Sequence, residues 1–294
     1  MLILHDPRCA DYGSPRRPEQ PARVTDTAIH LKSAHPEWDW RVPTQSVSDE
    51  VFLLAHTPEH LERVGEPRDF DADTPWFPNI ADHARRAVGA AIEATRHALA
   101  KRTPVFSLMR PPGHHATADR VMGFCYLNQI AIAALFARRK LHAARVAVWD
   151  FDAHHGNGTE AILHGVDGVF LASVHQHPGY PGTGTQDAGP HIRNWPVAPH
   201  TPAVDHMQAL RASLDAIVSF DPDLVLVSAG FDAYARDPIT QMTLERGDFS
   251  TLGRWLRETG RPAAALLEGG YSSDLPLLID AFLSAWEKSF LPVA

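Results

Sequence analysis

Two kinds of segment alternate along the chain from residue 80 onward, and this alternation constrains the fold more than any other feature of the sequence. Apolar residues recur at helical spacing in the segments 79–100, 124–140, 207–220, 249–260 and 275–290. Short apolar runs typical of buried strands occupy 103–108, 145–152, 168–175, 223–232 and 262–270. Strands that alternate with helices are typical of βαβ units, whose strands pair in parallel. The sequence therefore predicts an α/β fold built on a parallel sheet.

The composition is that of an ordinary globular domain. Hydrophobic residues make up 44% and charged residues 21% of the 294 residues. No internal repeat and no Gly/Ser-rich linker divides the chain. We therefore expect a single domain over residues 1–294.

Charge and cysteine content exclude several classes of protein. A net charge of −8 disfavours binding to nucleic acid or to an anionic membrane. The two cysteines, Cys9 and Cys125, form no CxxC motif, which argues against a disulfide framework and a cysteine zinc site. The start MLILHDP lacks a basic n-region, and the longest apolar run, 130–137, is shorter than the ~20 residues of a membrane helix. These features predict a protein of the reducing cytoplasm and leave its oligomeric state open.

Polar residues follow each predicted strand. The segments concerned are PPGHH at 111–115, DFDAHHGNG at 150–158, HQHPGYPGTG at 175–184, AGFDAYARD at 229–237 and EGGYSSD at 268–274. The carboxyl ends of parallel strands meet at one edge of a sheet, which is where open α/β folds form their active sites. We expect these segments to converge on one site.

Three of these residues form a candidate metal site. Asp152 and His154 are two positions apart at the end of a strand, so both side chains can point to the same side. Asp232 ends another strand segment and is placed to supply a third ligand. One histidine and two carboxylates with an open position suit Zn²⁺ or Fe²⁺ holding a water molecule.

Groups for proton transfer accompany this metal site. The adjacent His114 and His115 can take and return protons near neutral pH, and Asp150 and Asn157 are candidates to orient the two rings. In the EGGY segment, two glycines permit a tight turn that would bring Tyr271 toward a developing oxyanion.

Two other motifs are less informative. HTPEH at 56–60 matches a zinc-protease pattern, but Thr57-Pro58 predicts a helix start, which leaves His56 outside the helix that holds His60. The glycine-rich GYPGTG at 179–184 lacks the Lys-Ser/Thr of a phosphate loop and is more typical of a flexible active-site wall.

In chain order, the segments PPGHHA, GFCYLN, DFDAHHGNG, YPGTG, SAGFDA and LEGGY resemble those of the zinc-dependent histone deacetylase superfamily. The Glu of LEGGY and the Asn of HHGNG are similar to its class II and bacterial amidohydrolase branch. The resemblance implies the arginase/deacetylase fold: three layers, with helices on both faces of a mostly parallel sheet of about eight strands.

The resemblance also implies catalytic roles. Asp152, His154 and Asp232 would hold zinc, His115 would act as general base and acid, and His114 would be its electrostatic partner. Asp150 would lie behind His114. Asn157 stands where some members have an aspartate behind the second histidine. Tyr271 would polarise the amide carbonyl of the substrate.

Further implied roles concern the substrate and a monovalent cation. Phe124 and Tyr180 would form the walls of a narrow tunnel, although Tyr180 departs from the usual phenylalanine. The Gly123 carbonyl would meet the substrate amide, and Asp73 would grip the substrate backbone at the rim. Polyamine-selective relatives have a glutamate where this chain has Ile239. The resemblance also implies a structural K⁺ or Na⁺ site, whose residues would be Ser173, Asp150, Asp152 and His154. It further implies an internal product channel that Arg23 would line.

These observations predict an enzyme that removes an acetyl or other short acyl group from a primary amine such as an acyl-lysine side chain. Three alternatives are an acetylpolyamine or other small-molecule amide deacetylase, a metal-bound acyl-ligand sensor without catalysis, and an arginase-like hydrolase. The last is disfavoured because Gly156 stands where a second metal needs a carboxylate. The sequence leaves open the acyl carrier and the native metal.

Overall fold

The computed structural model of the protein describes residues 1–44 and 47–287. Its described part contains one eight-stranded sheet in the order β2-β1-β3-β8-β7-β4-β5-β6, and every strand pair is parallel. The strands are β1 Leu2–Leu4, β2 Asp39–Arg41, β3 Val105–Ser107, β4 Val146–Asp150, β5 Val169–Gln176, β6 Ile192–Val197, β7 Leu224–Ala229 and β8 Ala263–Leu267. The prediction of an α/β fold on a parallel sheet is confirmed.

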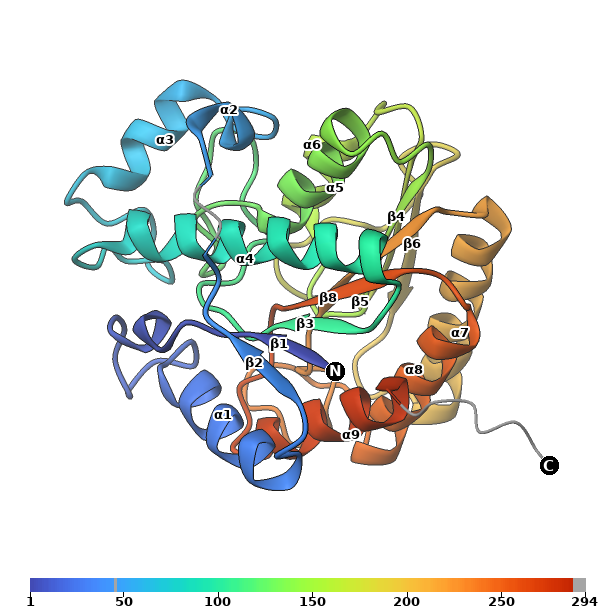
Figure 1. Ribbon diagram of the computed structural model, residues 1–294. Helices are drawn as coiled ribbons and strands as arrows, with labels where there is room; N and C mark the ends of the chain where they lie inside the picture. Colours follow the sequence, from blue (N-terminus) through green and yellow to red (C-terminus); the bar gives the residue numbers. More distant parts are fainter. Residues whose placement is uncertain (45–46, 288–294) are drawn as a thin grey trace.

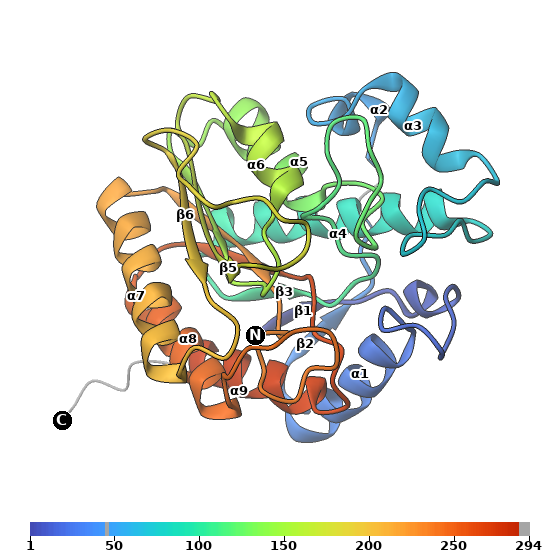
Figure 2. The same ribbon diagram turned by 180° about the vertical axis from the view of Figure 1, so that it is seen from behind.

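Helices cover both faces of the sheet, so the predicted three-layer architecture is also confirmed (Figure 1). One face carries α4 Ile80–Lys101, α5 Gln129–Lys140 and α6 Asn157–Leu163. The other carries α1 Ala22–Ala34, α7 Ala203–Phe220, α8 Arg246–Glu258 and α9 Leu275–Glu287. From behind, α4, α5 and α6 again lie on one side of the sheet and α1, α8 and α9 on the other (Figure 2). The short helices η1 Pro7–Ala10, α2 Asp49–Phe52 and α3 Pro58–Gly65 belong to the loop-rich first third.

The central strands are buried along their whole length. Every residue of β4, β5, β7 and β8 is buried, since helices cover both faces of the sheet. The edge strand β6 was not predicted, because its alternating burial and Pro196 hide the apolar pattern, and an edge strand tolerates a proline.

Two predicted helices extend beyond the helices that the structure describes. The helix predicted from residue 124 begins only at Gln129, because the side chain of Asn128 accepts a hydrogen bond from Ala131 N and caps the helix. Residues 124–127 lie in the preceding loop, where Met122 and Cys125 form an isolated bridge. The last predicted helix, 275–290, is present to Glu287, and 288–290 lie outside the described residues.

Candidate active site and metal centre

The predicted metal ligands come together at the carboxyl ends of the adjacent strands β4 and β7. His154 Nδ1 lies 3.1 Å from Asp152 Oδ1 and 2.9 Å from Asp232 Oδ2. All three ligand atoms lie within 4.8 Å of one another, and no other group of this kind occurs among the described residues. Both aspartates are fully buried, and the contact of Asp232 Oδ2 with His154 lacks good hydrogen-bond geometry.

The electrostatics of this group favour a positive charge between the two carboxylates. Burial and the charge of Asp152 raise the pKa of Asp232. Although burial opposes it, the carboxylates of Asp232 and Asp152 raise the pKa of His154 well above its usual value. A positive charge at His154 Nδ1 is therefore strongly favoured, and a divalent ion placed between the three side chains supplies it without a proton. The donor set of one imidazole and two carboxylates fits Zn²⁺ or Fe²⁺.

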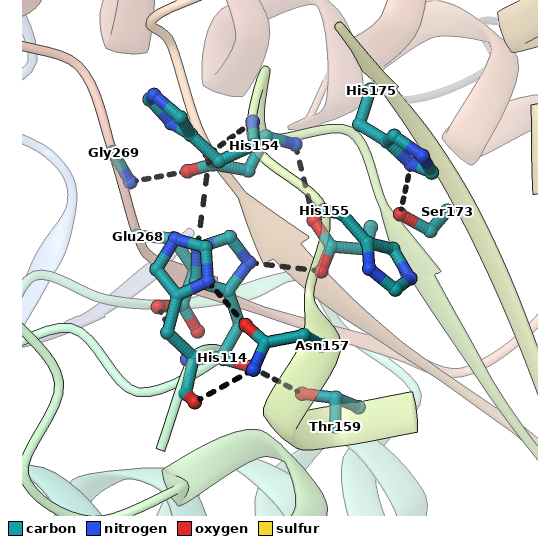
Figure 3. Close-up of polar contacts among 12 residues, drawn as sticks. His114, His154, His155, Asn157, Thr159, Ser173, His175, Glu268 and Gly269 are labelled. Carbon is teal, nitrogen blue, oxygen red and sulfur yellow. Dashed lines mark hydrogen bonds and ion pairs between the residues drawn. The ribbon is translucent and has the colours of Figure 1, made fainter. Parts of the chain in front are cut away.

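Backbone groups hold the two carboxylates in place. Gly269 N donates to Asp152 Oδ2 at 2.6 Å, as Figure 3 shows, and Ala153 N donates to Asp232 Oδ1 at 2.8 Å. A Cβ at Gly269 would collide with Asp232 Oδ2, so only glycine permits this close approach. The second residue of the EGGY segment is thus part of the floor of the site.

The two adjacent histidines have different partners, and Figure 3 labels one ring, His114, and one partner, Asn157. His114 Nδ1 lies 3.1 Å from Asp150 Oδ2, and His115 Nδ1 lies 2.8 Å from Asn157 Oδ1. Their ring centroids are 4.0 Å apart. An amide oxygen only accepts hydrogen bonds, so His115 carries its proton on Nδ1 and keeps a lone pair on Nε2.

These partners drive the pKa values of the two rings apart. Burial opposes the charged form of His114, but Asp152 and Asp150 raise its pKa to about 10. Burial, the charge of His114 and His154 hold the pKa of His115 well below its usual range. In the metal-free protein these shifts favour the charged form of His114 and the neutral form of His115, which can accept a proton. Two like residues pushed apart in this way are typical of acid–base sites.

A buried glutamate holds the backbone segment that carries the His pair. Glu268 Oε2 accepts hydrogen bonds from Gly113 N at 2.7 Å and from His114 N at 3.2 Å. Burial raises the pKa of Glu268 to about 7, although His114 opposes this shift. A site role for Glu268 could not be predicted from the sequence, because its partners are backbone groups 155 and 154 positions away.

A cavity of about 280 Å³ leads to these groups. Its lining contains His115, His154, Tyr271 and all the predicted substrate-binding residues, namely Asp73, Gly123, Phe124, Tyr180 and Ile239. It also contains Arg17 and Pro18, which the sequence analysis did not identify because no strand end precedes them. The structure thus brings His115, His154, Tyr271 and the predicted substrate-binding residues together around one cavity.

The walls of the cavity rest on an unusual turn. Gly123 and Phe124 have φ values of 56° and 67°, and Phe124 N donates to Thr74 Oγ1 at 3.0 Å. The turn places the Phe124 ring 5.8 Å from that of Tyr271. On the other side, the rings of Tyr180 and His115 are 5.0 Å apart. The aromatic rings therefore flank the approach to His115.

Comparison with known proteins identifies the family. A model of the histone deacetylase domain matches residues 17–285. The chain belongs to the histone deacetylase family. It is 38% identical over 263 residues to the histone deacetylase-like amidohydrolase of Pseudomonas aeruginosa, covering 83% of this chain and 67% of that protein.

Solved structures of the family agree with this assignment. The HDA15 HD domain superposes with a TM-score of 0.89 at 29% identity, covering 98% of this chain and 91% of that one. The acetylpolyamine aminohydrolase from Burkholderia pseudomallei gives 0.85 at 25% identity, with 97% and 98% covered. The predicted resemblance and the arginase/deacetylase fold are confirmed, and the protein is a hydrolytic deacetylase.

In this histone deacetylase family member, Arg23 lies directly behind the catalytic tyrosine candidate. Its guanidinium is 4.8 Å from the Tyr271 ring centre, and Arg23 Nε donates to Gly270 O at 2.7 Å. Arg23 and Tyr271 also line a second cavity of about 270 Å³. Glu19, which bonds both Arg110 and Arg23, holds the guanidinium there. The product channel stays a prediction for this deacetylase.

Ser173 belongs to the predicted monovalent cation site. Ser173 lies opposite Asp150 across β4 and β5, and its Oγ is 2.9 Å from His175 Nδ1, so the monovalent cation site stays a prediction.

In HTPEH, α3 begins at Pro58 with Thr57 as its cap, as predicted, although the rings of His56 and His60 still stack at 4.5 Å. Both cysteines are buried and free, and no described helix is long and apolar enough to span a membrane.

Proposed function

We propose that the protein is a zinc-dependent amidohydrolase that removes an acetyl or other short acyl group from a primary amine such as an acyl-lysine side chain. The observation that carries this proposal is the His pair, with His114 on Asp150 and His115 on Asn157, next to a group of three possible metal ligands beside the cavity. The ligand set also suits Fe²⁺, so the native metal is part of the test.

Asp152, His154 and Asp232 would hold the metal. Bound there, zinc supplies Lewis acidity that polarises the acyl carbonyl and lowers the pKa of water. His115 Nε2 accepts a proton from the water molecule as its oxygen adds to the carbonyl carbon. The charged His114 stabilises the negative charge that develops nearby.

Tyr271 and His115 complete the reaction. Burial raises the pKa of Tyr271 well above its usual value, so its hydroxyl stays protonated and can donate to the oxyanion. His115 then returns its proton to the departing nitrogen as the C–N bond breaks. The products are a carboxylate and an amine, and no covalent enzyme intermediate is required.

The cavity lining supports a slender substrate. We assign Phe124 and Tyr180 to the tunnel walls, the Gly123 carbonyl to the substrate amide N–H, and Asp73 to the rim. An acetylpolyamine is the second candidate, since a solved structural neighbour has that activity in its name. The apolar Ile239 and the cationic Arg17 in the lining disfavour a polycation. Acyl-lysine is therefore the preferred substrate class.

A hydrolysis screen of the purified protein tests this proposal. The panel contains acetyl-lysine peptides, trifluoroacetyl-lysine, longer acyl-lysines and acetylated polyamines, each with and without a chelator. We expect chelator-sensitive release of amine from acyl-lysine, restored by Zn²⁺. Turnover restricted to acetylpolyamines would transfer the assignment to the second candidate. An absence of turnover with one metal ion bound per chain would favour an acyl-ligand sensor.

The variant Tyr271→Phe separates catalysis from binding. It removes one hydroxyl without changing the shape of the cavity, so we expect kcat to fall by about 10²–10³-fold, a loss typical of a missing oxyanion donor. KM should change by less than about threefold, because the donor acts mainly in the transition state. Unchanged turnover would remove Tyr271 from the mechanism.

A further inference from the structure

Asp237 is a buried carboxylate that the mechanism above does not use. It is 7% exposed and lies between Asp232 and Ile239 in the chain. Within the described residues it forms no ion pair with Lys, Arg or His. Burial and the nearby Asp232 raise the pKa of Asp237 to about 7. An acid in such a position destabilises the folded protein unless its oxygens are satisfied by well-placed donors.

Both oxygens of Asp237 accept hydrogen bonds from residues that line the active-site cavity. Oδ2 accepts from Tyr271 N at 2.8 Å, and Oδ1 accepts from Ile239 N at 3.1 Å. Tyr271 and Ile239 both line the cavity. One carboxylate therefore connects two cavity-lining residues that are 32 positions apart in the chain (271 − 239).

The segment that carries Tyr271 is fixed residue by residue. Gly269 N donates to Asp152 Oδ2, and Gly270 O accepts from Arg23 Nε. The contact with Asp237 is the next in this series and acts on the backbone of Tyr271 itself. Of these three contacts, it is the one made to the residue that carries the phenol side chain.

We propose that Asp237 is a positioning residue, whose carboxylate fixes the backbone of Tyr271 so that the phenol hydroxyl meets the acyl carbonyl. A shift of about 1 Å in a group that stabilises the transition state can lower the rate by about 10²-fold. Hydrogen bonds to a carboxylate are also shorter and stronger than those to a neutral acceptor. This inference rests on the role of Tyr271 in the proposed function and adds a residue to it.

The test is a double-mutant cycle. Asp237→Ala and Asp237→Asn are each combined with wild-type Tyr271 and with Tyr271→Phe, and kcat and KM are measured for an acyl-lysine peptide. In the wild-type background we expect Asp237→Ala to lower kcat by about 10–100-fold with KM changed less than about threefold. Asp237→Asn should lie between, because its amide presents one oxygen and one donor to two backbone N–H groups. In the Tyr271→Phe background either change should lower kcat by less than about twofold.

A second measurement reports on the contact without using activity. Hydrogen exchange at the Tyr271 amide should be at least about tenfold faster in Asp237→Ala, because the amide loses its acceptor. Asp223→Ala is the matched control: Asp223 Oδ2 accepts from Arg145 N at 2.8 Å at the other end of the sheet. That variant should keep the wild-type kcat and the wild-type exchange rate at Tyr271. Metal content and melting temperature are recorded for every variant.

The possible results distinguish a failure of the positioning role of Asp237 from a failure of the proposed role of Tyr271. Equal losses of kcat in both backgrounds, or no loss in the wild-type background, would overturn the positioning role. If Asp237→Ala does not fold, Asp237→Asn supplies the same comparison. Full turnover by Tyr271→Phe would instead refute the proposed role of Tyr271. Faster amide exchange in Asp237→Ala would then still show that Asp237 holds this backbone, so the two failures are distinguishable.

Discussion

The residue behind His115 offers a direct way to change the acid–base chemistry. In Asn157→Asp, a carboxylate replaces the amide oxygen that lies 2.8 Å from His115 Nδ1. Two unit charges about 4 Å apart interact by about 4 kcal/mol at an effective dielectric constant of about 20, or roughly 3 pKa units. The cost of partly burying a carboxylate offsets part of this gain, so we expect the pKa of His115 to rise by about 1–2 units. Asn157 begins α6, where an acidic residue is well tolerated.

The assay is the pH dependence of kcat/KM for an acyl-lysine peptide. A raised pKa keeps His115 protonated to higher pH, and the protonated ring cannot act as the base. The acid limb of the profile should therefore move upward by about 1–2 pH units. Asn157→Ala is the comparison variant. It removes the acceptor without adding a charge, so kcat should fall without an upward shift. An unmoved or lowered acid limb in Asn157→Asp would refute the assignment of His115 as the base.

Two further changes test the support of the site. In Gly269→Ala the new methyl group collides with Asp232 Oδ2, so metal affinity should fall by at least about tenfold. The measurement is the metal content after dialysis against a weak chelator, and a wild-type metal content would contradict this prediction. In Glu19→Gln the buried Arg110 and Arg23 lose their carboxylate, so the free energy of unfolding should fall by about 3–5 kcal/mol in a denaturant titration. A change below about 1 kcal/mol would show that this network contributes little to stability.

The convergence of the three candidate metal ligands could be predicted because their signals are local. Asp152 and His154 are two positions apart on extended chain, and Asp232 follows another strand of the same sheet. The rule that parallel strands end at a common edge brings these three residues together without any knowledge of side-chain contacts. The His pair follows from the same rule, since it comes shortly after β3.

The residues that orient this machinery could not be predicted in the same way. Glu268 and Asp237 act on backbone N–H groups, and a backbone N–H has no residue type that a sequence pattern could reveal. Arg17 reaches the cavity from the loop before α1, with Nη1 donating to Asp73 O at 3.2 Å. Such contacts depend on how loops from distant parts of the chain pack, which hydrophobic periodicity does not specify.

The number of buried acids favours a cation at the proposed metal site. Five buried carboxylates end or follow the central strands: Asp150, Asp152, Asp232, Asp237 and Glu268. Backbone N–H groups satisfy their oxygens in part, but amides carry no net charge. His114 neutralises one of the five, and without a metal His154 takes a proton to neutralise another. A divalent cation must displace that proton, so metal affinity should decrease as the pH falls. Under the proposed function, the same competition allows His154 to have a raised pKa in the metal-free protein and still act as a metal ligand.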